Sequence, residues 1–220
     1  MRSKALDQVH RLLESVEKSP YTKYADVGSP QEVKGRRVVN LLLNGRRIEQ
    51  LTAEELACLV IGYEWWGKPQ EVVKVYKVGL TRMPESVDFL HGLDSATWNL
   101  YVHERWKSGS TDVNDTLKLI AMYDQYILEQ LGPPGYWHLR KADWYEWIAI
   151  DKYPLEWKLG EPIVNPDALE LAIREIQQAL EVDPTLAQGS FPDWWEDEED
   201  WHQRYYVLSS EPKYHHLLPK

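Results

Sequence analysis

The stretch that decides the fold is residues 52–84, TAEELACLVIGYEWWGKPQEVVKVYKVGLTRMP. It opens with a capping box at residues 52–55, in which a Thr and a Glu side chain satisfy the first free amides of a helix. The next apolar residues have the i, i+3, i+4, i+7 spacing of one helical face: Leu56, Leu59, Val60 and Tyr63. A Gly-Lys-Pro break at 67–69 precedes a second apolar face, which a Met-Pro pair at 83–84 ends. This pattern predicts two helices packed antiparallel as a hairpin.

Helical patterns continue along the rest of the chain, so we expect an all-α protein. The other helices are expected at residues 4–18, at about 94–107, from Asp112 or Asn114 to about 131, at about 136–150, and from Pro166 or Asp167 to Val182. The Gly-Pro-Pro-Gly run at 132–135 is a clear helix stop. Two-helix units at a spacing of roughly 35–45 residues indicate a helical repeat.

Residues 29–51 fit two different structures. Ser29-Pro30-Gln31-Glu32 is typical of a helix start, with a capping Ser and a Pro in the first helical position. Asn44-Gly45, however, lies between two partly apolar runs, so a small β-hairpin at 37–50 is the alternative. We favour the helix, because everything downstream is helical and a lone hairpin is marginally stable.

Residues 53–86 resemble a tetratricopeptide repeat, a 34-residue helical hairpin. The residues that fall at that family's characteristic positions are Leu56, Leu59, Val60, Tyr63, Gly67, Val72, Tyr76, Gly79 and Pro84. The helix at 172–184 also resembles the family, with Ala172, Ile176, Ala179 and Pro184 in phase. Val60 and Val72 are larger than the family's usual Gly and Ala, which implies looser packing.

The resemblance implies antiparallel helix hairpins stacked as a short right-handed α-solenoid. It divides the chain into an N-terminal helix and variable segment at 1–51, tetratricopeptide-like repeats at 52–186 and an acidic, Trp-rich C-terminal segment at 187–220. Such repeats bind peptides or protein surfaces on a concave face lined by the first helix of each unit. By position, that face would present Glu54, Ala57, Ile61, Glu64 and Trp65 from the first unit, Asn99, His103, Trp106 and Lys107 from the second, and Trp144 and Trp147 from the third. Alternatively, Trp65 and Trp106 pack on the next repeat.

The composition favours a protein partner. The 220 residues include 25 Lys and Arg against 35 Asp and Glu, a net charge of −10 that would repel duplex nucleic acid. The 11 Trp and 13 Tyr suit half-buried surfaces such as interfaces, although they also fill gaps between helices. Residues 193–201 combine six acids with three Trp, so Trp194 and Trp195 are candidate anchors for a basic partner. The other interpretation of this segment is a solvated linker.

The same composition predicts a cytoplasmic protein with neither cofactor nor metal. A single cysteine, Cys58, excludes an internal disulfide framework, and no apolar run is long enough to span a membrane. The N-terminal residues contain no apolar stretch typical of a secretory signal. The sequence has no Gly-rich phosphate loop, and the histidines at 202, 215 and 216 have no carboxylates at ligand spacing.

We therefore expect a non-enzymatic module that binds a partner protein or peptide, basic in character, through an acidic, Trp-rich concave surface. One concrete form is an immunity-type inhibitor that neutralises a basic toxin or nuclease by charge mimicry. The second alternative is a small hydrolytic enzyme using inter-helix carboxylates and histidines such as Glu104 and His103. Self-assembly through an exposed end of the repeat array is a third hypothesis, and the oligomeric state is left open.

Overall fold

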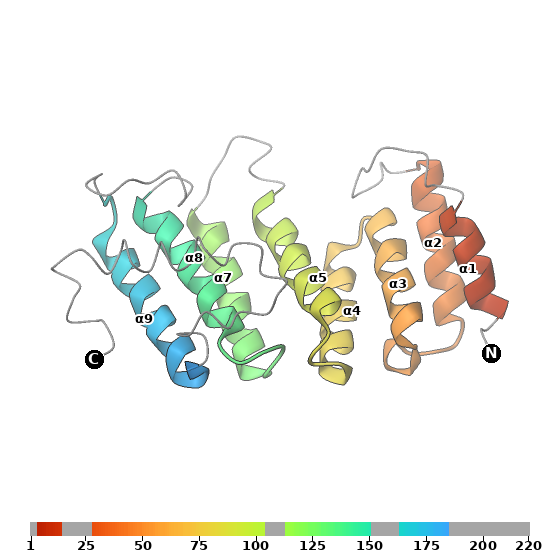
Figure 1. Cartoon of the computed structure of the whole chain (residues 1–220). Helices are drawn as coiled ribbons and strands as arrows, with labels where there is room; N and C mark the ends of the chain where they lie inside the picture. The colour runs from red at the N-terminus through yellow and green to blue at the C-terminus, as the bar shows by residue number, and fades with distance from the viewer. Residues whose placement is uncertain (1–3, 15–27, 104–112, 151–162, 185–220) are drawn as a thin grey trace. The chain divides into compact units, whose positions relative to one another are not determined.

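The computed structural model describes residues 4–14, 28–103, 113–150 and 163–184, and the regular structure in these residues is helical, with turns between the helices (Figure 1). They form eight α-helices and no strand, which confirms the all-α prediction. The chain divides into two compact units, unit 1 at residues 1–107 and unit 2 at residues 108–220. Among the described helices, none combines the length and the apolar composition needed to cross a lipid bilayer.

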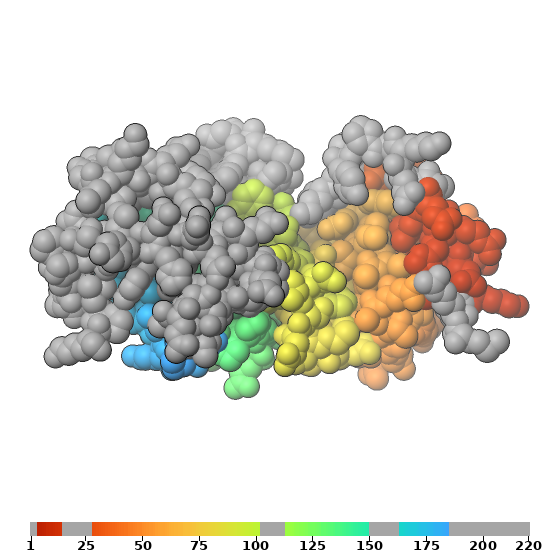
Figure 2. All heavy atoms as spheres, viewed as in Figure 1, coloured from red at the N-terminus to blue at the C-terminus, as the bar shows by residue number. Residues whose placement is uncertain are grey.

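Unit 1 is a row of helices in which each packs on the next one along the chain. Its elements are α1 (Lys4–Glu14), α2 (Pro30–Leu43), the 3-10 helix η1 (Ile48–Gln50), α3 (Ala53–Trp65), α4 (Pro69–Arg82), α5 (Val87–Trp98) and the π-helical turn η2 (Asn99–His103). On the face of this unit seen in Figure 2, the colour passes from red at α1 through orange at α3 to yellow at α4 and α5. The predicted helix at 4–18 is present as α1, and its last residues lie outside the described part of the chain.

The hairpin expected at 52–84 is present as α3 and α4. The capping box forms, because the Thr52 hydroxyl accepts from the Glu55 amide at 3.2 Å and the Glu55 carboxylate accepts from the Thr52 amide at 2.8 Å. At the other end of α3, Gly67 has a φ of +67°, which lets the Lys68 amide donate back to the Tyr63 carbonyl at 2.9 Å. These caps fix where the chain leaves α3 and enters α4.

The β-hairpin alternative at 37–50 is wrong, and the helix that we favoured is α2. Ser29 caps it by accepting from the Glu32 amide at 3.2 Å, and Pro30 begins it. Val38, Val39 and Leu42 are buried while Asn40 is exposed, which is the spacing of one helical face, whereas a strand would place residues 38, 40 and 42 on the same face. Asn44-Gly45 is therefore the turn that ends α2, and Gly45 has a φ of +74°.

Glycines and aromatic rings set how closely neighbouring helices of unit 1 approach. A Cβ atom on Gly35 of α2 would lie 2.7 Å from the carbonyl oxygen of Gly62 in α3, so only glycine permits this crossing. Between α4 and α5 the arrangement is reciprocal. The Phe89 ring fills the space beside Gly79, and the Tyr76 ring fills the space beside Gly92.

The helix expected at about 94–107 begins earlier than predicted. Helix α5 starts at Val87, directly after the Pro84 stop, because Phe89, Leu90 and Leu93 form a buried face. The chain then widens into η2 at Asn99–His103. Residues 104–107 of the predicted helix lie outside the described part of the chain.

Unit 2 contains the three remaining helices, α7 (Val113–Leu128), α8 (Tyr136–Ile150) and α9 (Pro166–Val182). Helix α8 packs against both others, and its contact with α9 is the more extensive. Part of their shared core is Leu139 and Ala142 against Ile176 and Ala179. The predicted stop between α7 and α8 is confirmed, because Gly132 and Gly135 both adopt positive φ, +74° and +83°. The helices predicted at 136–150 and 166–182 are confirmed with the same bounds.

Candidate functional site

The binding residues predicted on α3 share that helix but differ in surroundings. Glu54 is exposed, and its carboxylate lies 3.0 Å from His10 Nε2 on α1. Ile61, Glu64 and Trp65 are half-buried. The Cβ of Trp65 lies against Gly35, so α2 covers part of this side chain. The α3 residues are thus involved in packing of the first three helices as well as facing solvent.

The predicted residues farther along the chain are more deeply buried. Asn99 is 4% exposed, and its amide donates to the Ser95 carbonyl at 2.6 Å. Trp144 is 5% exposed and stacks on the half-buried Trp147, with ring centroids 5.4 Å apart. His103 is the last residue of η2. Several predicted sites lie outside the described residues: Glu104, Trp106, Lys107, Trp194, Trp195 and the three histidines near residues 202–216.

A cluster of cations and aromatic rings surrounds Trp66, the residue after α3. The Arg36 guanidinium and the Lys68 ammonium each lie 5.5 Å from the centroid of the Trp66 ring, within cation–π range. Tyr63 stacks on the same ring at 6.1 Å. Beneath them, the buried Glu32 accepts from Arg36 Nε at 2.9 Å and from the Gly28 amide. The Gly28 amide and the Arg36 guanidinium hold the pKa of Glu32 below its ordinary value.

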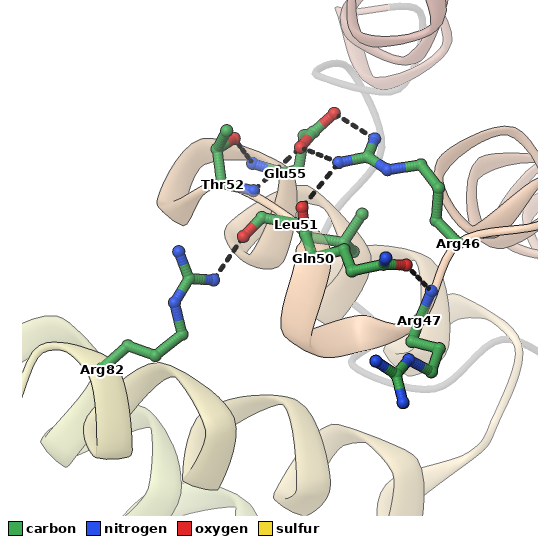
Figure 3. Close-up of polar contacts among 7 residues, drawn as sticks. All are labelled: Arg46, Arg47, Gln50, Leu51, Thr52, Glu55 and Arg82. Carbon is green, nitrogen blue, oxygen red and sulfur yellow. Dashed lines mark hydrogen bonds and ion pairs between the residues drawn. The ribbon is translucent and has the colours of Figure 1, made fainter.

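The α2–α3 connection carries the most enclosed ion pair of unit 1 among the described residues (Figure 3). Arg46 Nη1 and Nη2 donate to the two Glu55 carboxylate oxygens at 2.7 and 2.9 Å, and Nη2 also donates to the Gln50 carbonyl at 2.9 Å. Arg82 of α4 donates to the Leu51 carbonyl from the other side. The Arg46 hydrogen bonds outweigh the effect of burial and lower the pKa of Glu55 to about 2. These hydrogen bonds of Arg46 and Arg82 go to backbone and carboxylate groups of the chain itself, so this network fixes a connection.

Unit 2 contains a buried polar cluster that joins its three helices. Lys141 of α8 is 6% exposed, and its ammonium pairs with Asp124 of α7 at 2.6 Å and with Glu175 of α9. One turn earlier on α8, His138 Nδ1 lies 2.7 Å from the other Glu175 oxygen. Glu175 therefore has partners for both oxygens, and the cluster connects α7, α8 and α9.

The electrostatics of this cluster favour the charged forms. Burial by itself raises the pKa of Glu175, but hydrogen bonds from His138 and Lys141 outweigh it and the pKa is lowered overall. Burial likewise lowers the pKa of Lys141, yet Asp124 and Glu175 raise it overall. A carboxylate beside a histidine is also the arrangement that orients a general base. Here the ammonium neutralises that carboxylate, so the arrangement fits a structural connection better than an activated base.

The negative charge of the chain is concentrated in unit 2. Residues 1–107 contain 16 Lys and Arg and 14 Asp and Glu, whereas residues 108–220 contain 9 and 21. The net charges are thus +2 and −12. Within the described part of unit 2, every Lys and Arg side chain pairs with an acid of the same unit: Lys118 with Asp115, Arg140 with Asp143, Lys141 with Asp124 and Glu175, and Arg174 with Glu170. The candidate interaction surface is therefore the acidic surface of unit 2.

Comparisons with known proteins find no relative: no family model, no curated protein and no solved structure matches the chain. The resemblance to tetratricopeptide repeats therefore stays a prediction.

Three features of these clusters were not predicted from the sequence. The first is Trp66, whose neighbour Trp65 was named instead. The second is the pair His138 and Lys141, whose i, i+3 spacing places them on one face of a helix. The third is Glu175, which lies within the apolar face of α9 between Ala172 and Ile176. An acid within an apolar face is the signal that indicates a buried ion pair.

Proposed function

We propose that this chain is a non-enzymatic binding module that captures a basic protein through the acidic surface of unit 2. The observation that supports this proposal is the charge imbalance, 21 acids against 9 bases, together with the internal pairing of the described cations of that unit. Among the described acids of this unit, Asp167 and Glu181 are exposed. A concentrated field of one sign accelerates encounter with a partner of the opposite sign.

The fold of this module is proposed to be a short right-handed α-solenoid of tetratricopeptide-like hairpins within each unit. Two observations favour it. Each helix of unit 1 packs on its neighbour in chain order, and the α3–α4 hairpin has the connection expected for the repeat. An inhibitor of a basic toxin or nuclease would use the same acidic surface and is one form of this proposal. The cytoplasm is the compartment that we propose for it.

The experiment is affinity isolation with the immobilised full chain, followed by binding measurements with the purified partner. We expect a basic partner whose affinity falls as salt rises, because screening weakens interactions between exposed charges. Asp167→Lys with Glu181→Lys reverses two exposed acids of unit 2 and should weaken binding strongly. Glu49→Lys with Glu85→Lys makes the same change in net charge on exposed residues of unit 1 and should have less effect.

Two results would contradict the proposal. One is a partner whose affinity does not depend on salt. The other is an equal loss of affinity in the two double variants, since net charge alone would then explain binding and unit 2 would have no special role.

A further inference from the structure

Helix α7 of unit 2 has two apolar faces, and only one of them is covered. Its inner face buries Leu119, Tyr123 and Tyr126 completely. Its outer face carries Val113, Leu117 and Leu128, which are 54%, 45% and 84% exposed. A helix of a soluble protein ordinarily presents polar residues on the face away from its core. The outer face of α7 departs from that pattern.

The three exposed side chains form one stripe. With 3.6 residues per turn, they fall within about 60° of one another around the helix axis and extend over about 22 Å along it. Ala121, which is also exposed, lies beside this stripe at about 80° from Val113, and Asp124, with a side chain 55% exposed, lies within it between Leu117 and Leu128. Six of the seven large apolar side chains that are exposed in the described residues belong to unit 2: Val113, Leu117, Leu128, Val164, Leu171 and Val182. Exposed apolar side chains and excess acid thus occur in the same unit.

We infer that this outer face of α7, Val113, Leu117, Ala121 and Leu128, is the docking surface for an amphipathic basic helix of the partner protein. This inference rests on the proposed function and names where the partner binds. Apolar residues of the incoming helix, three or four apart, contact the stripe, and Lys or Arg side chains on its flanks meet the acidic field of unit 2. A stripe of about 22 Å matches about four turns of such a helix.

The net negative charge of unit 2 favours one of the possible occupants of this surface over the others. A second copy of the chain would bring two units of net charge −12 together, and like charges at an interface cost binding free energy. A membrane with anionic lipid headgroups is repelled for the same reason. A helix with Lys and Arg beside its apolar residues meets both requirements of the surface, since it covers the leucines and neutralises the carboxylates.

The test uses the full chain and labelled peptides of about 18 residues, long enough to cover the stripe. The first peptide has Leu on one helical face and Lys elsewhere. The second has the same Leu positions with Glu in place of Lys, and the third has the composition of the first in scrambled order. Fluorescence anisotropy measures their affinities for the wild-type chain, for Leu117→Gln with Leu128→Gln, and for Val33→Gln. Val33 is a matched control, because it is 59% exposed on α2 of unit 1.

We expect the amphipathic Lys peptide to bind, and the Glu and scrambled peptides to bind at least about tenfold more weakly. The Leu117→Gln, Leu128→Gln chain should lose about tenfold or more in affinity for the Lys peptide, as for residues central to an interface, and Val33→Gln should lose nothing. Circular dichroism should show unchanged helix content and thermal unfolding, since both leucines are on the surface.

Four results would overturn the inference. Equal binding of the scrambled peptide would show attraction by charge alone, and unchanged affinity of the leucine variant would place the contact elsewhere. Loss of a self-associated species in the leucine variant, seen by sedimentation, would make a second copy the occupant. If the partner isolated as above still binds the leucine variant fully, the proposed function stands and the α7 surface fails.

Discussion

Arg46 and Glu55 face each other across the α2–α3 connection and form two parallel hydrogen bonds of 2.7 and 2.9 Å. The Glu55 residue is 3% exposed, whereas the Arg46 side chain is 36% exposed. The same carboxylate also accepts from the Thr52 amide at 2.8 Å. One acid therefore caps α3 and binds the segment that follows α2, so the two helices depend on a common group.

Replacing Arg46 should destabilise unit 1. Arg46→Ala leaves a buried carboxylate without its cation, and the expected loss in the free energy of unfolding is about 2 kcal/mol. Arg47→Ala is the control, because Arg47 is exposed on the same connection and should change stability by less than about 0.5 kcal/mol. Urea unfolding followed by circular dichroism measures both. Equal losses in the two variants would contradict the role given to Arg46.

Acid should remove the contribution of Glu55. Its pKa is about 2 in the folded chain against an ordinary value of 4.5, so the unfolded chain binds the proton at higher pH. The stabilisation is complete above the ordinary value and declines as the pH falls from 4.5 toward 2. Glu55→Gln should be less stable at neutral pH and should lose less stability on acidification. Glu49→Gln, at an exposed position, should keep the wild-type pH dependence, and a Glu55→Gln curve parallel to wild type would refute the prediction.

In unit 2, Lys141 has the role that Arg46 has in unit 1, because it pairs with a buried carboxylate, that of Glu175. Lys141→Met removes the cation between two carboxylates of α7 and α9, and we expect a loss of about 3 kcal/mol. Arg174→Met removes a cation whose pair is exposed on both sides, Arg174 at 59% and Glu170 at 42%, and the expected loss is below about 1 kcal/mol. Thermal unfolding of the full chain compares them. Similar losses would indicate that burial of the cluster contributes nothing.

Two indole groups of α8 allow a matched comparison. Trp137 Nε1 donates to the Leu131 carbonyl at 2.6 Å, whereas the buried Trp144 Nε1 has no acceptor among the described residues. Replacement by Phe removes the same atoms at both positions. Trp137→Phe should therefore cost about 1–2 kcal/mol more than Trp144→Phe, because only the first breaks a hydrogen bond. Chemical denaturation gives the difference, and the reverse order would contradict this assignment.

Adding one methyl group at Gly35 should separate α2 from α3. The new Cβ of Gly35→Ala would lie 2.7 Å from the Gly62 carbonyl oxygen and 2.9 Å from the Trp66 amide nitrogen, and backbone atoms cannot rotate away. We expect a loss of about 1–3 kcal/mol. Asn40→Ala, at an exposed position of the same helix, should be close to neutral. A stable Gly35→Ala chain would show that the two helices can move apart freely.

The sequence predicted best those elements whose ends carry their own signals. The α3–α4 hairpin, α8 and α9 have Thr, Gly, Pro or Asn at their ends, and these residues act locally. The start of α5 was not predicted, because Phe89 and Leu90 begin its buried face before the region at about 94–107 that the sequence indicated. For residues 29–51, the same Asn-Gly pair is compatible with a helix end or a hairpin. Contacts of Val38 and Leu42 with their surroundings decide between them, and periodicity within the segment does not reveal those contacts.

The candidate surfaces were harder to predict than the helices. Net charge was visible in the sequence, but its division at residue 107 required knowing which helices pack together. The exposure of Leu117 and Leu128 also depends on tertiary structure, since leucines on a helix ordinarily indicate a core face. His138 and Glu175 are 37 residues apart, and only the packing of α8 on α9 brings them into contact.

The paired rings of α4 and α5 have a mechanical consequence. Helix α4 carries Gly79 and Tyr76, and helix α5 carries Gly92 and Phe89. The Phe89 ring occupies the space beside Gly79, and the Tyr76 ring occupies the space beside Gly92. Sliding either helix by one turn, about 5.4 Å, would drive a ring into a residue that has a Cβ atom. The two rings therefore fix the register in which α4 packs on α5.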